Sequence, residues 1–362
     1  MPSGPDSNRL LTSLGLGLLK RIVFALVFTL MVLAAVGWNQ YQSVLDLPKQ
    51  RLALQQPTTF TVPAGYTASR LVQELSERQW LDEPLKLKLL FKLQPELTKL
   101  RSGEYEIRVG DTLEALLDRL ISGRSVQYRV TLIEGATVKE MLEILANNKQ
   151  LEKTLSATDA VTLSSELNLK SDSAEGLFLA ETYYFERGTS DRELLLRAHK
   201  MLNDVLDKHW QSRDEKLPLK TPYEALILAS IIEKETGLSS ERGQISGVFI
   251  RRLNRGMRLQ TDPTVIYGLG DRYQGNLTRK HLKETTPYNT YRIPALPPTP
   301  IALVGEEAIV ASLNPEPGKA LYFVAKGDGS HQFSDTLEQH NRAVREYQLK
   351  RRKDYRSSPE AN

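Results

Sequence analysis

The stretch TPYEALILASIIEKETG, residues 221–237, predicts a buried helix. Thr221 can cap the helix and Pro222 suits its first position, while Glu224 would complete a capping box. Gly237 is a natural stop. Apolar residues between these signals cover the helical wheel almost all round, which is typical of a helix buried on every side.

Two acidic residues near the end of this helix are candidate catalytic groups. Glu233 and Glu235 fall on different sides of the wheel, so helical spacing alone does not choose between them. A carboxyl group in apolar surroundings keeps its proton to higher pH than one in water, as a general acid requires. The alternative is a structural ion pair with the next helix, expected at about residues 241–254, which carries Arg242, Arg251 and Arg252.

Two later stretches are rich in side chains that can hold a sugar: RLQTDPTVIYGLG (258–270) and TPYNTY (286–291). Amide groups, hydroxyl groups and tyrosine rings offer hydrogen bonds and stacking faces to pyranose rings. The candidate substrate-binding residues are Gln260, Thr261, Asp262, Tyr288, Asn289 and Tyr291, together with Glu235. Asp262 has a structural alternative, because Asp262 and Pro263 also resemble the cap and first position of a short helix over residues 264–267.

A strand and a turn are expected near the carboxyl end. ALYFVA (320–325) has the composition of a strand, and Asp328-Gly329 suggests the turn of a hairpin. His331 follows this turn, and we interpret it as structural rather than catalytic.

Composition excludes several classes of site. The 362-residue chain has no cysteine, so a disulfide, a zinc–cysteine site and a cysteine nucleophile are impossible. We expect neither a metal site nor a cofactor. The net charge of +4 could come entirely from the run KRRK at residues 350–353, so we predict no nucleic-acid partner.

Residues 22–38, IVFALVFTLMVLAAVGW, contain no charge and predict a single transmembrane helix. Arg9, Lys20 and Arg21 precede it, and basic residues favour the cytoplasmic side. Residues 1–21 are therefore predicted to be cytoplasmic, with the rest of the chain beyond the membrane. The alternative is a signal peptide cleaved near the small residues 35–37.

A strand–glycine–helix unit recurs three times. The three copies span residues 59–81, 104–126 and 129–151. Each turns at a glycine (Gly65, Gly110 or Gly135), and a threonine two residues later can cap the helix. The unit resembles the LysM module, a sugar-binding unit of proteins that handle peptidoglycan. The alternative is a supporting α+β subdomain that binds nothing.

Four motifs occur in order and carry a resemblance to a known family. They are EKET (233–236), LQTDPTVIYG (259–268), YNTY (288–291) and LYFVAKGDGSHQFSDTLEQHN (321–341). Together they closely resemble the endolytic murein transglycosylases, also called YceG-like, from the membrane segment to about Tyr347. One departure is Ala180-Glu181-Thr182, where the family more usually has Pro-Asp-Thr.

The resemblance implies an activity and a location. Such enzymes are single-pass proteins of the inner membrane with their bulk in the periplasm. They cleave the β-1,4 bond between MurNAc and GlcNAc inside nascent glycan strands and leave 1,6-anhydro-MurNAc ends, which terminates strand elongation. The first glutamate of EKET, here Glu233, is implied to be general acid and then base. The implied partners are peptidoglycan glycan strands and penicillin-binding synthases.

Two rival functions remain open. A hydrolase of the same glycan would need a second carboxylate, which Glu235 or Asp262 could supply. A scaffold that binds peptidoglycan through the repeats would need no catalytic acid.

The predicted fold class is α+β, with a transmembrane helix, a LysM-like subdomain and a mixed α+β catalytic domain. The expected divisions are a cytoplasmic N-terminus (1–21), the transmembrane helix (22–38), a linker (39–58), the LysM-like subdomain (59–151), the catalytic domain (152–349) and a basic tail (350–362).

Overall fold

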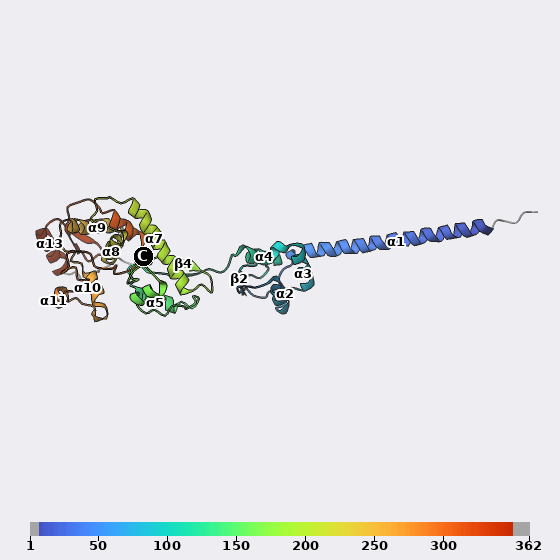
Figure 1. Ribbon diagram of the computed structural model, residues 1–362, viewed down its shortest axis with the longest axis horizontal. Coiled ribbons are helices and arrows are strands. Elements are labelled where there is room, and N and C mark those ends of the chain that lie inside the picture. The colour runs from blue at the N-terminus through green and yellow to red at the C-terminus, as the bar shows by residue number, and fades with distance from the viewer. Residues whose placement is uncertain (1–6, 350–362) are drawn as a thin grey trace, which may run out of the picture. The chain divides into compact units, whose positions relative to one another are not determined.

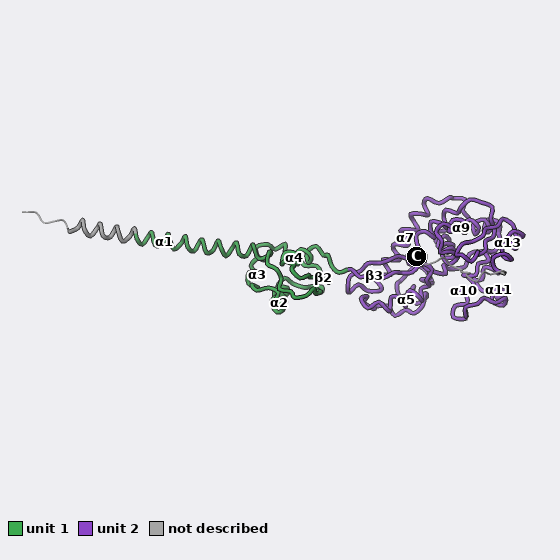
Figure 2. Tube along the Cα trace, turned by 180° about the vertical axis from the view of Figure 1, so that it is seen from behind, with its two compact units in different colours: residues 1–126 green, residues 127–362 purple. Residues whose placement is uncertain are grey.

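A computed structural model describes residues 7–349, which form two compact units divided between Val126 and Gln127 (Figures 1 and 2). Helices are combined in both units with short two-stranded antiparallel sheets, which confirms the α+β class. The predicted basic tail lies outside the described residues, as do the first six residues of the predicted cytoplasmic segment.

The elements of the first unit are α1 (Ser7–Leu45), η1 (Leu47–Lys49), β1 (Thr58–Val62), α2 (Ala68–Glu77), α3 (Pro84–Leu93), η2 (Pro95–Thr98), β2 (Gly103–Ile107) and α4 (Leu113–Ser122). Those of the second unit are β3 (Tyr128–Thr131), α5 (Val138–Asn147), α6 (Ala160–Leu167), β4 (Thr182–Phe185), α7 (Asp191–Gln211), α8 (Pro222–Glu235), α9 (Ser239–Asn254), α10 (Asp262–Leu269), η3 (Gly270–Arg272), α11 (Arg279–Lys283), α12 (Glu306–Leu313), β5 (Tyr322–Ala325), β6 (His331–Ser334), α13 (Leu337–Val344) and η4 (Arg345–Leu349).

Helix α1 contains an apolar stretch, Arg21–Leu45, that is long enough to cross a membrane by length and composition. The helix continues past the predicted end at Trp38, since neither glycine nor proline interrupts it before Pro48. Residues 39–58 are therefore not simply a linker. Within this range Val44, Leu47 and Leu52 are buried in the core of the first unit, because they are apolar and pack against its helices and strands.

The first two strand–glycine–helix copies share one sheet. β1 pairs with β2 in antiparallel register, which places Phe60 opposite Tyr105, and both rings are fully buried. The predicted caps are confirmed, because the side chains of Thr67 and Thr112 accept backbone hydrogen bonds at the starts of α2 and α4.

The third copy belongs to the second unit. Thr137 caps α5 as predicted and forms a capping box with Glu140. However, β3 pairs with β4, whose residues were expected in the catalytic domain. The division after Val126 therefore differs from the expected boundary at residue 151, because the partner strand of this copy comes later in the chain.

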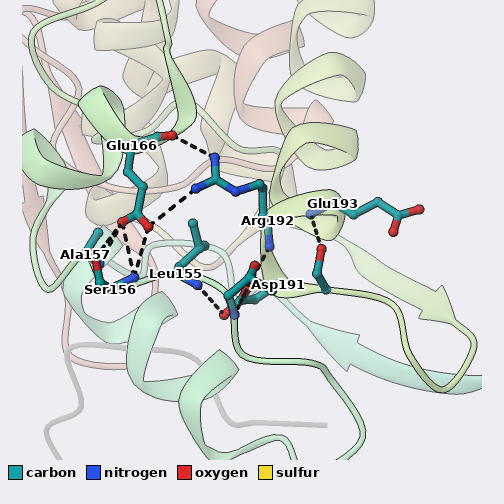
Figure 3. A network of polar contacts seen from close by, with 9 residues as sticks. Leu155, Ser156, Ala157, Glu166, Asp191, Arg192 and Glu193 are labelled. Atoms are coloured by element: carbon teal, nitrogen blue, oxygen red, sulfur yellow. Dashed lines mark hydrogen bonds and ion pairs between the residues drawn. The ribbon is translucent and has the colours of Figure 1, made fainter.

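Two carboxylates hold the segment between α5 and α6 against the start of α7 (Figure 3). Asp191 accepts a hydrogen bond of 2.9 Å from the backbone N–H of Thr154. The Glu166 carboxylate accepts one of 2.9 Å from the N–H of Ala157. Arg192 donates to the backbone carbonyl oxygen of Glu166 at 2.7 Å. These contacts satisfy half-buried backbone groups in a segment without regular structure.

Helix α8 is buried, as predicted, and it packs at the centre of the second unit. Every residue from Ala225 to Glu233 is buried, and α7, α9, α10 and α12 all contact the helix. The hydroxyl of Thr221 caps it by accepting the N–H of Glu224. The Glu224 carboxylate instead accepts the N–H of Lys220, so the expected reciprocal capping box is not formed.

A buried carboxylate, Glu175, joins the start of α5 to α10. Its Oε1 accepts a hydrogen bond of 3.0 Å from the N–H of Val138, and its Oε2 accepts one of 3.1 Å from the hydroxyl of Tyr267. Burial raises the pKa of Glu175 to about 7, although both hydrogen bonds oppose this shift. The carboxyl group is therefore protonated in the folded protein over a pH range in which an exposed glutamate is ionised.

Glu175→Gln is expected to stabilise the protein at about pH 8 but not at about pH 5. A glutamate in the unfolded chain has a pKa near 4.5, whereas the pKa of Glu175 in the folded protein is about 7. The proton held by Glu175 therefore contributes stability below about pH 4.5 that is lost as the pH rises through about 7, on the order of 3 kcal/mol.

The measurement is thermal or urea unfolding at both pH values. The control is Glu143→Gln, which changes an exposed carboxylate on α5, the helix whose first residue Glu175 contacts. An unchanged pH dependence of stability in the Glu175 variant would contradict the expected result.

Candidate active site

Glu233 lies at the buried end of α8, where it accepts two hydrogen bonds. Its Oε1 is 2.8 Å from Nη2 of Arg242 in α9, and its Oε2 is 3.1 Å from the backbone nitrogen of Gly305 at the cap of α12. Only 3% of its side chain is exposed. The ion pair that the sequence offered as an alternative is therefore present.

Arg242 is shared by three carboxylates. Besides Glu233, its Nη2 is 3.1 Å from Glu134 Oε2 and its Nη1 is 2.6 Å from Glu307 Oε2. Glu134 precedes α5 and Glu307 lies in the first turn of α12, so three remote segments meet at one guanidinium group. One positive charge faces three carboxylates, so they are not fully neutralised by it.

This environment places the pKa of Glu233 near neutrality. Burial raises the pKa to about 7; the charge of Arg242 opposes the rise, and the carboxyl group of Glu134 adds to it. A carboxyl group with such a pKa can give up a proton and take one back at neutral pH. Glu233 thus has the protonation behaviour of a general acid and base.

Glu235 lies two residues further along α8 and has different neighbours. It is half-buried and accepts a hydrogen bond from the hydroxyl of Thr261. Burial raises its pKa to about 7, and the negative charge of Asp262 acts in the same direction. Electrostatics alone therefore gives α8 two candidate acids.

A cavity of about 640 Å³ opens beside Glu235 and collects most of the predicted substrate-binding residues. Gln260 and Asp262 are exposed at its wall, and Thr261 is buried behind them. Tyr291 also lines the cavity, and its hydroxyl donates to Asp262 Oδ1 at 2.7 Å. The YNTY and QTDPT stretches thus meet in space, as a shared site requires.

Gln260 adopts a left-handed backbone conformation, with φ of 51°. Its N–H donates to the carbonyl of Thr290, and its side-chain oxygen accepts a 3.3 Å hydrogen bond from Arg252. A non-glycine residue with positive φ is uncommon and costs free energy, and such residues cluster at functional sites.

The expected helix cap at Asp262 is wrong. Helix α10 begins at Asp262 itself and its cap position is Thr261, whose side chain makes no capping hydrogen bond. The carboxylate of Asp262 is left exposed and directed to Tyr291, because the hydroxyl of that tyrosine supplies its hydrogen bond.

Tyr288 and Asn289 are not among the residues that line this cavity. Asn289 is buried and donates to the backbone carbonyls of His281, Leu282 and Glu284. Tyr288 packs edge-on against Tyr267, with ring centroids 4.9 Å apart. Their contacts hold the loop that carries Tyr291.

His331 is a cavity residue that the sequence interpretation assigned only a structural role. Glu241 accepts hydrogen bonds from its backbone N–H, at 2.9 Å, and from its ring Nδ1, at 2.7 Å. The ring packs edge-on against Phe323 and also lines the cavity. The long motif over residues 321–341 includes His331, but only the paired strands β5 and β6 place it here.

Among the side chains that the structure describes, no group of three or more His, Asp or Glu is placed to hold a metal ion. The chemistry available in this region is that of carboxyl groups with raised pKa values, tyrosine hydroxyls and one oriented histidine ring. This combination fits proton transfer to and from a polyhydroxylated substrate.

Comparison with known proteins gives matches over most of the chain. Residues 60–346 match the family described as YceG-like. An endolytic murein transglycosylase of Bacillus subtilis is 28% identical over 304 residues, which covers 79% of this chain and 83% of that protein. The Streptococcus pneumoniae protein with the same name is 27% identical over 364 residues, covering 91% of this chain but 65% of its own length.

A crystal structure of a yceG-like protein from Listeria monocytogenes is also similar. It shares 27% sequence identity and has a TM-score of 0.46, and the match covers 80% of this chain and 99% of that one.

Proposed function

The chain belongs to the YceG-like family and is a lytic murein transglycosylase. We propose that it cleaves nascent glycan strands at internal bonds, with Glu233 as the general acid and then the general base. The cleaved bond is the β-1,4 link between MurNAc and GlcNAc, and each cut leaves a 1,6-anhydro-MurNAc end. The single observation that carries the proposal is the placement of Glu233, the first glutamate of the EKET motif, as a buried carboxyl group held between Arg242 and Gly305.

In the first step Glu233 donates its proton to the glycosidic oxygen as the bond from that oxygen to C1 breaks. In the second step the C6 hydroxyl of the same MurNAc attacks C1, and the Glu233 carboxylate takes the hydroxyl proton. Glu233 ends in its starting state and no water is consumed. The attack is intramolecular, so the C6 hydroxyl is present at a high effective concentration. This replaces part of the catalysis that a hydrolase obtains from a second carboxylate acting as base or nucleophile.

The cavity beside Glu235 is the proposed binding region for the glycan. Gln260, Asp262 and Tyr291 offer it hydrogen bonds, and Thr261 positions Glu235. Tyr288 and Asn289 contribute through the loop that they hold. Because the cavity and Glu233 flank the same end of α8, we propose that one strand passes this end of the helix during cleavage.

The proposed location is the inner membrane, crossed once by α1, with the catalytic part in the periplasm. The apolar stretch of α1 and the basic residues that precede it in the sequence support this orientation. At this location the enzyme meets strands as they are made, so cleavage terminates their elongation. Penicillin-binding synthases are the proposed partners.

The LysM-like role of residues 59–151 is part of the proposal. It is supported by the repeated strand, left-handed glycine and threonine-capped helix in all three copies. Since the third copy packs in the second unit, the first two copies are the proposed glycan-binding pair.

The proposed reaction is tested by incubating the enzyme with purified, uncrosslinked glycan strands and analysing the cleavage products. Mass spectrometry is expected to detect internal fragments that end in 1,6-anhydro-MurNAc. Reducing ends would instead identify a hydrolase, in which Glu235 or Asp262 supplies the second carboxylate. Binding without any cleavage would favour the scaffold.

A further inference from the structure

Helix α3, with the sequence PLKLKLLFKL, is apolar on two opposite faces. One face carries Leu87, Leu90 and Phe91, which are buried in the core of the first unit. Packing inside the unit therefore accounts for only half of the apolar residues of this short helix.

The opposite face of α3 carries a leucine stripe, formed by Leu85, Leu89 and Leu93. These residues are four apart, so they lie along one side of the helix. They are 77%, 45% and 44% exposed. Three large apolar side chains are therefore exposed on this one short helix. Leucine is a poor choice for a solvated helix face, and clustered exposed leucines mark an interaction surface.

Lysines border the leucine stripe. Lys88 and Lys92 are exposed and precede it around the helix, while Lys86 lies on its other side. The amine of Lys86 donates a hydrogen bond to the hydroxyl of Ser43 in α1 and pairs with Glu83. Apolar side chains flanked by lysines are typical of helices that lie in a membrane interface.

Helix α3 is next to the point where α1 ends its apolar stretch. The two helices are in contact, and Figure 1 shows α3 beside the carboxyl end of α1. Trp38 and Tyr41 precede Ser43 by five and two residues, and they are 65% and 44% exposed with ring centroids 5.9 Å apart. Such aromatic residues locate the membrane–water interface of a spanning helix.

We propose that α3 lies on the membrane surface beside α1, with the leucine stripe in the lipid and the lysines at phospholipid headgroups. The proposal rests on the proposed membrane anchor, and it adds a second, peripheral contact that fixes the orientation of the first unit on the bilayer. The occupant of the stripe is lipid because α3 is tied to the spanning helix at interface level, where the bordering lysines complement anionic headgroups.

The absence of cysteine makes this contact directly measurable. A single cysteine at position 89 (Leu89→Cys) carries an environment-sensitive fluorophore in the full chain, reconstituted in nanodiscs that contain anionic phospholipid. Glu106→Cys on β2 is the control, because Glu106 is exposed within the same unit but belongs to a different element. Leu30→Cys in α1 reports whether the anchor is inserted.

The label at position 89 is expected to shift its emission to the blue and to be quenched by lipid-borne nitroxides placed about 5–10 Å below the headgroups. The label at position 106 should show neither change. Adding Leu85→Ser and Leu93→Ser should remove most of the quenching at position 89 while circular dichroism stays unchanged, since both leucines are exposed.

Each contrary result has a separate meaning. Quenching at position 30 without quenching at position 89 would retain the anchor and overturn the surface contact. A blue shift at position 89 without lipid quenching would identify a protein occupant, such as a second copy, and would also overturn it. Absence of quenching at both positions would remove the anchor and, with it, the contact.

Discussion

Glu233→Gln is expected to lower the rate of glycan cleavage by about 10²–10⁴-fold, the usual contribution of a general acid–base group. Glutamine has the size of glutamate and an oxygen that can accept from Arg242 or Gly305, but it has no proton to donate. The folded protein should therefore be retained while the proton transfer is lost. Product formation from uncrosslinked strands measures the rate, and circular dichroism checks the fold.

Glu235→Gln and Asp262→Asn are the matched comparisons, because both residues line the cavity. They are expected to weaken glycan binding and raise KM, with a much smaller effect on kcat than Glu233→Gln. Equal loss of kcat in the Glu233 and Asp262 variants would count against a single catalytic acid. If Glu235→Gln were inactive and Glu233→Gln active, the acid would be Glu235.

Arg242→Met is expected to destabilise the protein by about 3–5 kcal/mol, the usual cost of removing one partner of a buried ion pair. Arg242 is 7% exposed in its side chain and faces Glu134, Glu233 and Glu307. Without it these carboxylates repel one another with no positive charge between them. Urea unfolding measures the loss.

Arg242→Met is also expected to shift the pH dependence of kcat. The charge of Arg242 lowers the pKa of Glu233, so removal of Arg242 should raise this pKa from its value of about 7. A general acid must be protonated, so the alkaline limb of kcat should shift to higher pH. Arg242→Lys keeps the positive charge and should shift the limb less, which also provides a test if the methionine variant is too unstable.

Arg251→Met is the control on the same helix, because Arg251 donates to the backbone carbonyls of Glu316 and Ala320 and not to Glu233. It should leave the pH profile in place. An unshifted alkaline limb in the Arg242 variants would show that Glu233 is not the titrating acid.

Local sequence signals predicted many of the elements of both units. The start of α8 at Thr221 and its burial follow from a capping threonine and an apolar helical wheel, both properties of consecutive residues. The threonine caps of α2, α4 and α5 and the hairpin of β5 and β6 follow for the same reason. The motifs also identified the two stretches that meet at the cavity.

The environment of each acid could not be read from helical spacing. Glu233 and Glu235 are about 200° apart around α8, and a wheel that is apolar on all sides does not say what faces each direction. The answer came from Glu134, Gly305 and Thr261, which are remote in the chain. The same holds for the pairing of β3 with β4, which moved the third repeat into the second unit.

The sequence by itself determined the family, the buried helix and the short list of acids, because these depend on residue type and local spacing. Only the tertiary structure decided that one acid shares Arg242 with two other carboxylates while the other opens to a cavity. The physical reason is that pKa values and ion pairs depend on which groups packing brings within a few ångströms, and those groups belong to segments far apart in the chain.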